Sequence, residues 1–588
     1  MENMMSVKDA AERWGVSTRR VTVLCREGRV AGAVLEKGRW QIPADAEKLA
    51  DQRVKTGTYR KPTPQPEQLP LPVGISDYRR ASSQYCYVDK TLFLRELLDE
   101  LPAAALFTRP RRFGKSLCMD MVRTFFEKTG EDTWVYFRDT EIGKCGEKYR
   151  GYQGKYPVIF LTLKDVKLPT WGDTLADLRF LLASEFQRHG ELADSPRCSP
   201  VHREYYQRMV TGQADETEMG NALLVLSQML HAHHGVAPLL LVDEYDTPIQ
   251  QGRTRGFYEE IVGFLRNLFS GGFKDNPHLF LGLLTGVLRE EGLFSGMNNL
   301  VTYSVLDDSY GQYFGFTPEE VQQLCAQLGG PCSYEELCQW YGGYRFGDRD
   351  IFDPWSVVNC FHKKSLQVYN ISHQVLEEAL EGASPEFYGN LRTLLQGGSV
   401  AVGVDPASVY GRLLFSGYLR PESFLGGETY RVTLPNREIA QVYRKVTLKK
   451  LGEMFPPSAA VPVQEAIYTG KALPKRLKKL LRQAVRRYEG EGSYQKLLLG
   501  LTALLDGRYF VRSYGESGGG KCEFALKPRE ETMPGFLVGL RASKKARELK
   551  DLAKSALKRL EEQNYDAEGQ AVKYGIAFCG NKVEAAKG

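Results

Sequence analysis

The chain has 588 residues, of which 42% are hydrophobic and 26% are charged, and its net charge is +6. This length is enough for about three or four domains of ordinary size. No apolar run approaches the ~20 residues that span a bilayer, and the N-terminal residues lack the apolar core of a secretory signal, so we expect no membrane association. The 11 Cys are scattered without a C-x-x-C pair, which predicts reduced thiols, no zinc site and a cytoplasmic location.

Residues 1–50 are predicted to form a small helix-turn-helix domain. Helical patterns at 7–14 and 18–27 are separated by Gly15, and residues 38–43 follow as a wing-like strand. The segment resembles the excisionase and MerR-type DNA-binding fold. The resemblance implies a recognition helix that faces bases and phosphates, with the wing strand beside it. The candidate DNA contacts are Thr18, Arg19, Arg20, Thr22 and Arg39. A small helical interaction domain that does not bind DNA is the alternative.

Residues 51–72 are predicted to form an extended linker, because Pro, Gly and basic side chains follow one another there without apolar periodicity. We therefore expect the N-terminal domain to be tethered rather than packed. Lys and Arg are in excess in residues 1–61 and again in residues 444–487. Both segments are candidates for contact with nucleic acid.

Residues 109–116 predict a phosphate-binding loop. They follow an apolar run at 103–107 and precede a helical pattern at 117–128, which is the strand-loop-helix order of a P-loop. Backbone N–H groups of such a loop hold phosphates at a helix N-terminus. Lys115 would reach the β and γ phosphates of ATP, and the Ser116 hydroxyl would hold Mg²⁺. The predicted nucleotide contacts are Arg109, which replaces the usual first Gly, and Arg111, Arg112, Phe113, Gly114, Lys115, Ser116 and Leu117.

A second motif ends the apolar run at 238–242 with paired carboxylates. A continuous apolar run of this length is typical of a strand buried on both faces of a parallel sheet. Asp243 at its end would bind Mg²⁺, directly or through water, and Glu244 would polarise the attacking water. A solvated turn after the strand is the alternative for this pair alone. Together with the loop at 109–116, the pair predicts a Mg²⁺-dependent ATP hydrolase.

The segments between these motifs predict an α/β domain. Apolar runs at 157–161 and 279–286 indicate two more buried strands, and helical patterns alternate with them, which favours a parallel sheet. Residues 374–450 are mostly helical with short strands. His231, His233 and His234 end the helical pattern before the Asp243 strand. We interpret them as cations near a helix C-terminus and not as a metal site.

Ten motifs from Tyr87 to Glu438 resemble those of the bacterial and archaeal AAA-ATPase-like proteins that carry a degenerate PD-(D/E)XK nuclease domain at the C-terminus. They are YVDKT (87–91), RPRRFGKS (109–116), VDEYD (242–246), LTGVLR (284–289), FSGMNNL (294–300), YFGFT (313–317), WYGGYRF (340–346), DPWS (353–356), SGYL (416–419) and LPNRE (434–438). In that family Arg replaces the first P-loop Gly as a rule. The resemblance implies an AAA-like P-loop ATPase domain at 73–300, a helical or winged-helix-like lid at 301–450 and an α/β nuclease-like domain at 451–588.

The same resemblance suggests further catalytic residues. Thr285 stands where such ATPases place a polar sensor, so it would hydrogen-bond the attacking water or the γ-phosphate. A strand-end hydroxyl that caps the next turn is the alternative. Arg289, Arg111 and Arg112 would read the γ-phosphate, since guanidinium suits bidentate phosphate contact, or would form surface ion pairs.

The C-terminal domain departs from the metal-dependent nucleases it resembles. The related proteins have a helix with Glu, a hairpin with Asp and a strand with Glu-x-Lys. The corresponding residues of this chain are Glu491, Glu523, Gly539 and Arg541. Glycine supplies no metal ligand, and arginine stays protonated, so it serves poorly as a base. We predict that this domain keeps its fold and has lost cleavage, with nucleic-acid binding or a purely scaffolding role left open.

Residues 475–488 predict a basic amphipathic helix. Leucines recur on one face, while Lys478, Lys479 and Arg482 lie largely on the other, without an acidic residue between 471 and 488. Phosphate binding and a merely solvated basic face are both compatible with this pattern.

Three functions therefore compete. The first is an ATP-dependent switch in a DNA-associated regulatory or defence role, with ATP and Mg²⁺ as ligands. The second is a slow ATP-dependent signalling switch with protein partners and no nucleic acid. The third is an active metal-dependent nuclease.

Overall fold

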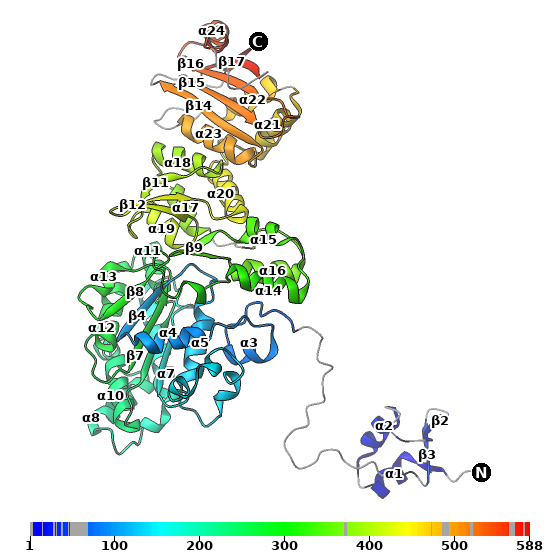
Figure 1. The fold of residues 1–588 in the computed structure, drawn as a ribbon, viewed down its shortest axis with the longest axis vertical. Helices are drawn as coiled ribbons and strands as arrows, with labels where there is room; N and C mark the ends of the chain where they lie inside the picture. The colour runs from blue at the N-terminus through cyan, green and yellow to red at the C-terminus, as the bar shows by residue number, and fades with distance from the viewer. Residues whose placement is uncertain are drawn as a thin grey trace. The chain divides into compact units, whose positions relative to one another are not determined.

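The computed structural model describes residues 4–14, 16–26, 30, 32–36, 39–44, 46, 69–369, 373–471, 473–484, 493–517, 521–563, 571–579 and 582–588. The chain divides into two compact units, Met1–Gln68 and Leu69–Gly588 (Figure 1). The predicted linker lies largely outside the described residues, as does Glu491. None of the described helices is long and apolar enough to cross a membrane, and the cysteines whose side chains are described are free thiols.

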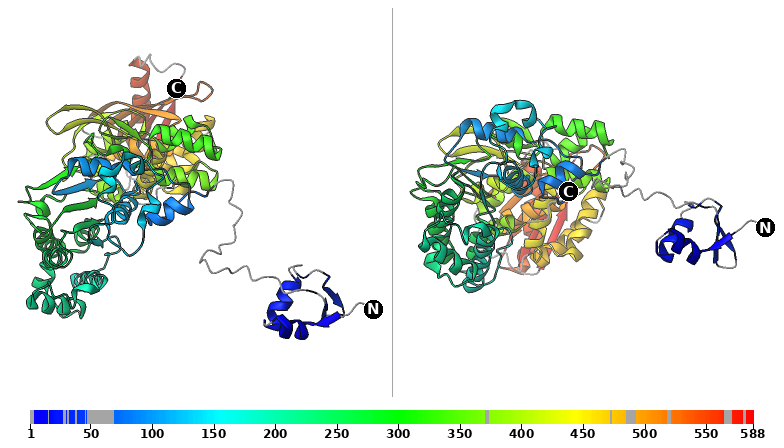
Figure 2. Two further views of the ribbon diagram at one scale, coloured as in Figure 1. Left: turned by 60° about the horizontal axis from the view of Figure 1, so that its bottom comes forward. Right: turned by 90° about the horizontal axis from the view of Figure 1, so that it is seen from below.

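The N-terminal unit contains two short helices and a three-stranded antiparallel sheet (Figure 2). Its elements are β1 (Met4–Ser6), α1 (Val7–Trp14), α2 (Thr18–Arg26), β2 (Val34–Glu36) and β3 (Arg39–Pro43). Ala10 and Trp14 lie one turn apart on α1, and they form a small core with Val21 of α2 and Ile42 of β3. The sequence therefore predicted both helices and the strand β3 correctly.

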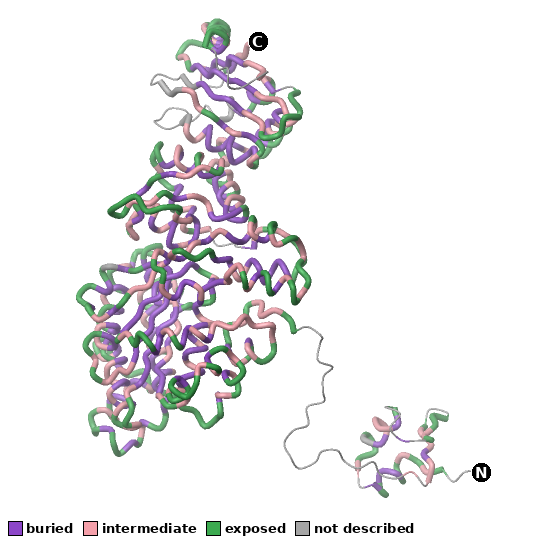
Figure 3. The backbone as a smooth tube through the Cα atoms, viewed as in Figure 1, coloured by how far each residue is buried: buried purple, intermediate pink, exposed green. Residues whose placement is uncertain are grey.

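A five-stranded parallel sheet forms the centre of the second unit, in the order β5-β6-β7-β4-β8. The strands are β4 (Ala104–Thr108), β5 (Val158–Thr162), β6 (Leu239–Asp243), β7 (Leu281–Gly286) and β8 (Leu300–Tyr303). Every residue of β4, β6 and β7 is buried (Figure 3), as expected for apolar strands covered on both faces. The predicted parallel α/β sheet is confirmed.

Two hydrophobic cores lie on opposite faces of this sheet, and successive strand residues point to one core and then to the other. Ala105 and Phe107 of β4 face α4 (Leu92–Glu100) and α5 (Lys115–Phe126), whereas Ala104 and Leu106 face the other core. That second core contains α7 (Trp171–Arg188), α10 (Ala222–His234) and α12 (Tyr258–Phe273). The remaining helices up to residue 294 are α3 (Tyr78–Gln84), α6 (Glu147–Arg150), α8 (Pro200–Val210), α9 (Glu216–Gly220), α11 (Thr247–Arg255) and α13 (Glu291–Phe294). The sheet is thus the middle of three layers, and it brings the ends of β4, β6 and β7 together.

Residues 318–450, which we call the middle region, contain two groups of elements. The first is α14 (Pro318–Leu328), α15 (Tyr334–Tyr341), the antiparallel pair β9 (Tyr344–Phe346) and β10 (Arg349–Ile351), and α16 (Pro354–Lys363). The second is α17 (Gln374–Leu380), α18 (Pro385–Leu395), β11 (Val400–Gly403), α19 (Val409–Phe415), β12 (Arg420–Gly426), β13 (Thr429–Thr433) and α20 (Arg437–Lys450). Capping boxes at Thr317 and Ser333 fix the starts of α14 and α15. The strands β11, β13 and β12 form an antiparallel sheet in that order.

The C-terminal part is a mixed five-stranded sheet with helices on both faces. Its elements are α21 (Pro457–Thr469), α22 (Leu473–Ala484), α23 (Ser493–Leu504), β14 (Tyr509–Ser517), β15 (Lys521–Pro528), β16 (Phe536–Ala542), α24 (Leu549–Glu562), β17 (Val572–Cys579) and β18 (Lys582–Lys587). The parallel pair β16–β17 is connected through α24, and the other neighbours are antiparallel. The predicted hairpin and the strand that follows it are present, and the predicted basic helix is described as far as Ala484.

Candidate nucleotide-binding site

The loop at 109–114 connects the end of β4 to the start of α5. Arg112 has φ +73° and Gly114 has φ +85°, so both adopt the left-handed conformation. Such turns point successive N–H groups toward one concave surface, which is how backbone loops hold anions. A glycine suits position 114 because its φ is positive, although the space around it is open. The sequence therefore folds here into a loop that is suited to phosphate at the start of a helix.

The side chain of Lys115, the first residue of α5, lies inside this loop. Its Nζ donates hydrogen bonds to the carbonyls of Arg109, at 3.0 Å, and Pro110, at 2.9 Å, and the residue is only 4% exposed. Burial lowers the pKa of Lys115, while the nearby carboxylates of Glu244, Asp246 and Asp243 act in the opposite direction. The ammonium group is therefore held next to a cluster of acidic residues without pairing closely with any one of them.

Asp243 is the centre of a buried hydroxyl–carboxylate cluster. Its Oδ2 accepts a hydrogen bond from the Ser116 hydroxyl at 2.6 Å, and its Oδ1 accepts one from the Thr285 hydroxyl at 2.6 Å. The three residues come from β6, α5 and β7, and Asp243 is 1% exposed. A carboxylate beside a hydroxyl is a set of hard oxygen donors, which is the ligand type that Mg²⁺ prefers. The residues present therefore fit a magnesium ion.

Glu244 follows directly and has φ +51°, which is uncommon for a residue with a side chain. Its backbone N–H donates to the Thr285 hydroxyl at 3.2 Å, and its Oε2 accepts from the Thr247 hydroxyl at 3.3 Å. Strained backbone of this kind persists where neighbouring contacts fix it, often at functional sites. Thr285 therefore positions both Asp243 and Glu244.

A cavity of about 330 Å³, which we call the P-loop cavity, lies against this loop. This volume falls within the range of small-molecule sites. Its walls include residues 72–76, Lys90, residues 112–118, Glu244, Phe316 and Trp355. The Nζ of Lys90 donates to both Glu320 carboxylate oxygens at 2.6 Å, which ties this wall to α14. The sequence did not predict that residues 72–76 or Trp355 of the DPWS motif would line this cavity, because they lie far from the loop along the chain.

The arginines predicted to contact phosphate have different environments. The guanidinium of Arg109 is buried, donates to the carbonyls of Thr108 and Tyr303 at 2.9 Å and 2.7 Å, and lies over Phe314. The side chain of Arg109 therefore does not point into the loop. Only the carbonyl of Arg109 takes part in the site, where it accepts a hydrogen bond from Lys115. Arg289 is exposed, donates to the Thr302 hydroxyl at 3.2 Å, and is not among the described residues that line the P-loop cavity.

Arg111 and Arg112 connect the loop to its surroundings. Arg111 donates to Gln250 of α11 at 2.7 Å. Arg112 donates to the carbonyl of Tyr369 at 2.9 Å, and its guanidinium lies over the Trp355 ring at 5.0 Å. Two further predicted contacts, Phe113 and Leu117, line the cavity, and Phe113 is buried.

Among the candidate nucleic-acid contacts, Thr18, Arg19 and Arg39 are exposed and Thr22 donates to the carbonyl of Thr18 at 2.9 Å. Arg20 and Arg482 lie on helices, but their side chains are outside the described part. In the basic helix, Lys478 pairs with Glu584 of β18 at 3.1 Å and Lys479 donates to the carbonyl of Ser458 at 3.2 Å. The acidic partner that the local sequence lacked is thus supplied from a distant strand.

Two of the positions predicted for a degenerate nuclease site, Glu523 and Arg541, belong to an ion-pair cluster. Glu523 of β15 lies opposite Gly539 of β16, and its Oε1 meets the guanidinium of Arg541 at 2.6 Å and that of Arg559 at 3.0 Å. A Cβ at position 539 would come within 3.3 Å of the Ala556 carbonyl, so a larger side chain has little room. Arg541 thus places a fixed positive charge beside the one carboxylate. The cluster does not fit a metal ion.

The three histidines at the end of α10 contact different partners. His231 meets His278 at 3.1 Å between their Nδ1 atoms, His233 meets the Ser195 hydroxyl at 2.8 Å, and His234 lies 3.4 Å from Glu191. Across the described ranges, no group of three or more His, Cys, Asp or Glu has the arrangement of a metal site.

The fold and the loop together define a P-loop-like α/β core. Residues 72–293 match the model of the AAA-ATPase-like family, which is described as a predicted AAA-ATPase. An uncharacterized protein in the vnfD 5′ region of Azotobacter chroococcum mcd 1 is 28% identical over 304 residues, which are 51% of this chain and 53% of that protein. The chain thus spans about half the length of this curated relative. The family match includes Lys115, Ser116, Asp243, Glu244 and Thr285, and it supports an ATPase of the AAA type over that range.

Proposed function

We propose that the chain is a Mg²⁺-dependent ATP hydrolase that acts as a nucleotide switch. The observation that carries this proposal is the cluster in which Asp243 accepts hydrogen bonds from Ser116 and Thr285 beside the buried ammonium group of Lys115. P-loop hydrolases need these four functions close together: a cation for the phosphates, a hydroxyl and a carboxylate for the metal, and a polar group that orients the attack.

Each residue has a separate role in this proposal. Lys115 and the loop N–H groups bind the β and γ phosphates, and Ser116 and Asp243 hold Mg²⁺. The metal, when bound, neutralises charge that develops on the phosphate oxygens. Glu244 accepts a proton from the attacking water, and Thr285 acts as a positioning residue through its contacts with Asp243 and Glu244.

The ATPase assignment is tested by two substitutions in the full-length chain. Lys115→Ala removes the phosphate-binding cation, so ATP binding and turnover should both be lost. Glu244→Gln keeps the shape of the side chain and removes its basicity, so turnover should fall by about 100-fold or more while ATP still binds. Lys128→Ala and Glu259→Gln, which change exposed residues of neighbouring elements, are the matched controls. Turnover unaffected by both site substitutions would refute the assignment.

For the N-terminal unit we propose DNA contact through the exposed start of α2. Thr18 and Arg19 are exposed there, and Arg39 is exposed on the neighbouring hairpin. Electrophoretic binding to duplex DNA should be salt-dependent, should weaken in Arg19→Ala more than in Lys8→Ala, and should be lost when residues 1–68 are removed. Equal binding with and without these residues would instead favour the switch with protein partners.

For residues 451–588 we propose an α/β nuclease-like fold that no longer cleaves. The ion pair between Glu523 and Arg541 supports this proposal, because the carboxylate that would bind a metal already has a buried cationic partner. In this arrangement the domain presents a surface to a partner, while residues 73–300 handle ATP and residues 301–450 form the lid. An active nuclease is the alternative, and no described residue near Glu523 favours it.

A further inference from the structure

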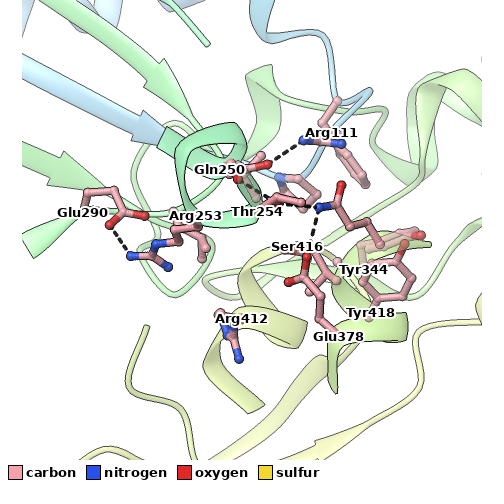
Figure 4. A pocket seen from close by; sticks show the side chains of 17 residues that line it. Arg111, Gln250, Arg253, Thr254, Glu290, Tyr344, Glu378, Arg412, Ser416 and Tyr418 are labelled. Atoms are coloured by element: carbon pink, nitrogen blue, oxygen red, sulfur yellow. Dashed lines mark hydrogen bonds and ion pairs between the residues drawn. The ribbon is translucent and has the colours of Figure 1, made fainter. Parts of the chain in front are cut away.

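A second cavity lies where the P-loop, α11 and the middle region meet (Figure 4). We call it the junction cavity, and its volume is about 90 Å³. The P-loop contributes Pro110, Arg111 and Phe113, whereas the opposite wall comes from α17, α19 and the residues after α19. Of the described residues, Phe113 alone lines both cavities. The junction cavity is therefore a separate site on the other side of the loop.

Five charged side chains line the junction cavity, and three of them are cationic. Arg253 pairs with Glu290 at 2.7 Å, Arg111 donates to the neutral amide of Gln250, and Glu378 accepts from Gln374 at 2.9 Å. The Nε of Arg412, on α19, has no hydrogen-bond partner within the described part of the chain. The wall thus has one more cation than anion.

Two buried polar atoms at the junction cavity lack partners. The Nε of Arg412 and the hydroxyl of Ser416, one helical turn later, are both inaccessible to solvent, and neither forms a hydrogen bond within the described part of the chain. Buried polar groups are nearly always satisfied, and a guanidinium nitrogen that is buried without a partner is costly. A guanidinium and a hydroxyl together match the oxygens of a carboxylate or a phosphate.

The rest of the junction cavity is mainly apolar. Its lining includes the apolar and aromatic side chains of Val287, Leu288, Val375, Tyr344 and Tyr418. A water occupies about 10–15 Å³ on the same measure, so the cavity has room for roughly six to nine non-hydrogen atoms. This is too small for a nucleotide and large enough for a short organic anion.

We propose that the junction cavity binds a small organic anion, whose carboxylate or phosphate contacts Arg412 and Ser416 and whose apolar part lies against the valine, leucine and tyrosine side chains. The bound anion would bridge the P-loop and α19, so it would act as an effector at a site other than the ATP site. Binding itself does not require ATP hydrolysis. Only its effect on turnover depends on the function proposed above.

Benzoate and inorganic phosphate are suitable probes, because benzoate has nine non-hydrogen atoms and an apolar ring, whereas phosphate is an oxyanion alone. Calorimetric titration of the full-length protein with benzoate should show one saturable site with a dissociation constant of about 0.1–1 mM. Arg412→Met should weaken binding at least tenfold, and Ser416→Ala should weaken it less. Arg431→Met, which changes an exposed arginine of the same region, is the matched control and should leave binding unchanged.

The outcomes separate the two anions from each other and from no site at all. Binding of benzoate that depends on Arg412 and persists in the presence of ATP supports a carboxylate ligand. Arg412-dependent binding of phosphate alone, again not displaced by ATP, supports a phosphate ligand. Absence of saturable binding of either probe, or equal binding by the wild-type chain and Arg412→Met, would overturn the proposal. The mild Ser416→Ala variant keeps the test valid if Arg412→Met fails to fold.

Discussion

Replacing Glu523 by Gln should destabilise the C-terminal sheet. It should not change DNA cleavage, because we propose that this domain does not cleave DNA. The side chains of Glu523 and Arg541 are each 7% exposed and meet at 2.6 Å. Removing one charge of a buried pair leaves the other uncompensated, which costs about 3–5 kcal/mol. The second partner, Arg559, is 51% exposed and adds at most about 1 kcal/mol. Because Gln keeps the shape of the side chain, we expect a loss near 3 kcal/mol.

Hydrogen exchange measured by mass spectrometry is the appropriate assay, because the tryptophans all lie before residue 356 and do not report on this sheet. A loss of about 3 kcal/mol should speed exchange in β15 and β16 by about 100-fold if these strands open locally. Glu531→Gln, at an exposed position of the following turn, is the control. The double variant with Arg541→Met should recover part of the protection, since it removes both charges.

Two results would refute this reasoning. Exchange in β15 and β16 that is unchanged by Glu523→Gln would show that the pair does not hold the sheet together. Cleavage of DNA by the wild-type chain in Mg²⁺ or Mn²⁺, abolished by Glu523→Gln, would show that the carboxylate is a metal ligand and that the domain is an active nuclease.

Two further substitutions test the contacts around the P-loop. Gly417→Ala should lower the free energy of unfolding by about 1–3 kcal/mol and weaken ATP binding, because Gly417 has φ +81° and a Cβ there would come within 3.1 Å of Pro110. Gly427→Ala is the control, since Gly427 has φ +59° and no neighbour within 4 Å of an added Cβ. Equal effects of the two substitutions in thermal unfolding and in ATP titration would contradict the argument. Asp353→Asn should stabilise the fold increasingly as pH rises. Burial, with the Glu438 carboxylate next, raises the pKa of Asp353 from 3.8 to about 7. The contribution of its protonation to the free energy of unfolding is therefore complete below pH ~4 and is lost as pH rises through 7. The thermal unfolding temperatures of the wild-type chain and of Asp353→Asn should therefore diverge as pH rises from about 5 to about 7. The same difference between the two proteins at every pH in this range would contradict the argument.

The sequence predicted the sheet and the loop because both depend on local pattern. Short apolar runs without polar interruption are typical of strands covered on both faces, so β4, β6 and β7 were found within a few residues of their bounds. Glycine before Lys115 and Ser116 identified the loop, because the positive φ at 114 favours that residue. The contact between Thr285 and Asp243 needed the order of strands, since 42 residues separate the two in the chain.

Other features could not be predicted because they depend on residues far apart in the chain. The side chain of Arg109 is directed away from the loop by carbonyls from residues 303 and 309, which no local pattern reveals. Lys478 pairs with Glu584, which lies 106 residues later in the chain. The local sequence therefore showed no acidic partner for the positive charge of the basic helix, although the fold supplies one. The cavity walls at Trp355 and at Arg412 come from the middle region, whose position against the P-loop follows only from tertiary packing.

The middle region connects the two cavities through the P-loop. Phe113 lines both of them and packs against Tyr344, with ring centroids 4.9 Å apart, while Arg112 donates to the Tyr369 carbonyl. A ligand shifts a conformational equilibrium only by contacting the alternative states differently. A ligand that moves the loop at Arg112 would therefore change its contact with Tyr369, and a ligand in the junction cavity would lie against Pro110, Arg111 and Phe113 of the loop. Reciprocity then requires that ATP and the small anion alter each other's affinity by the same factor.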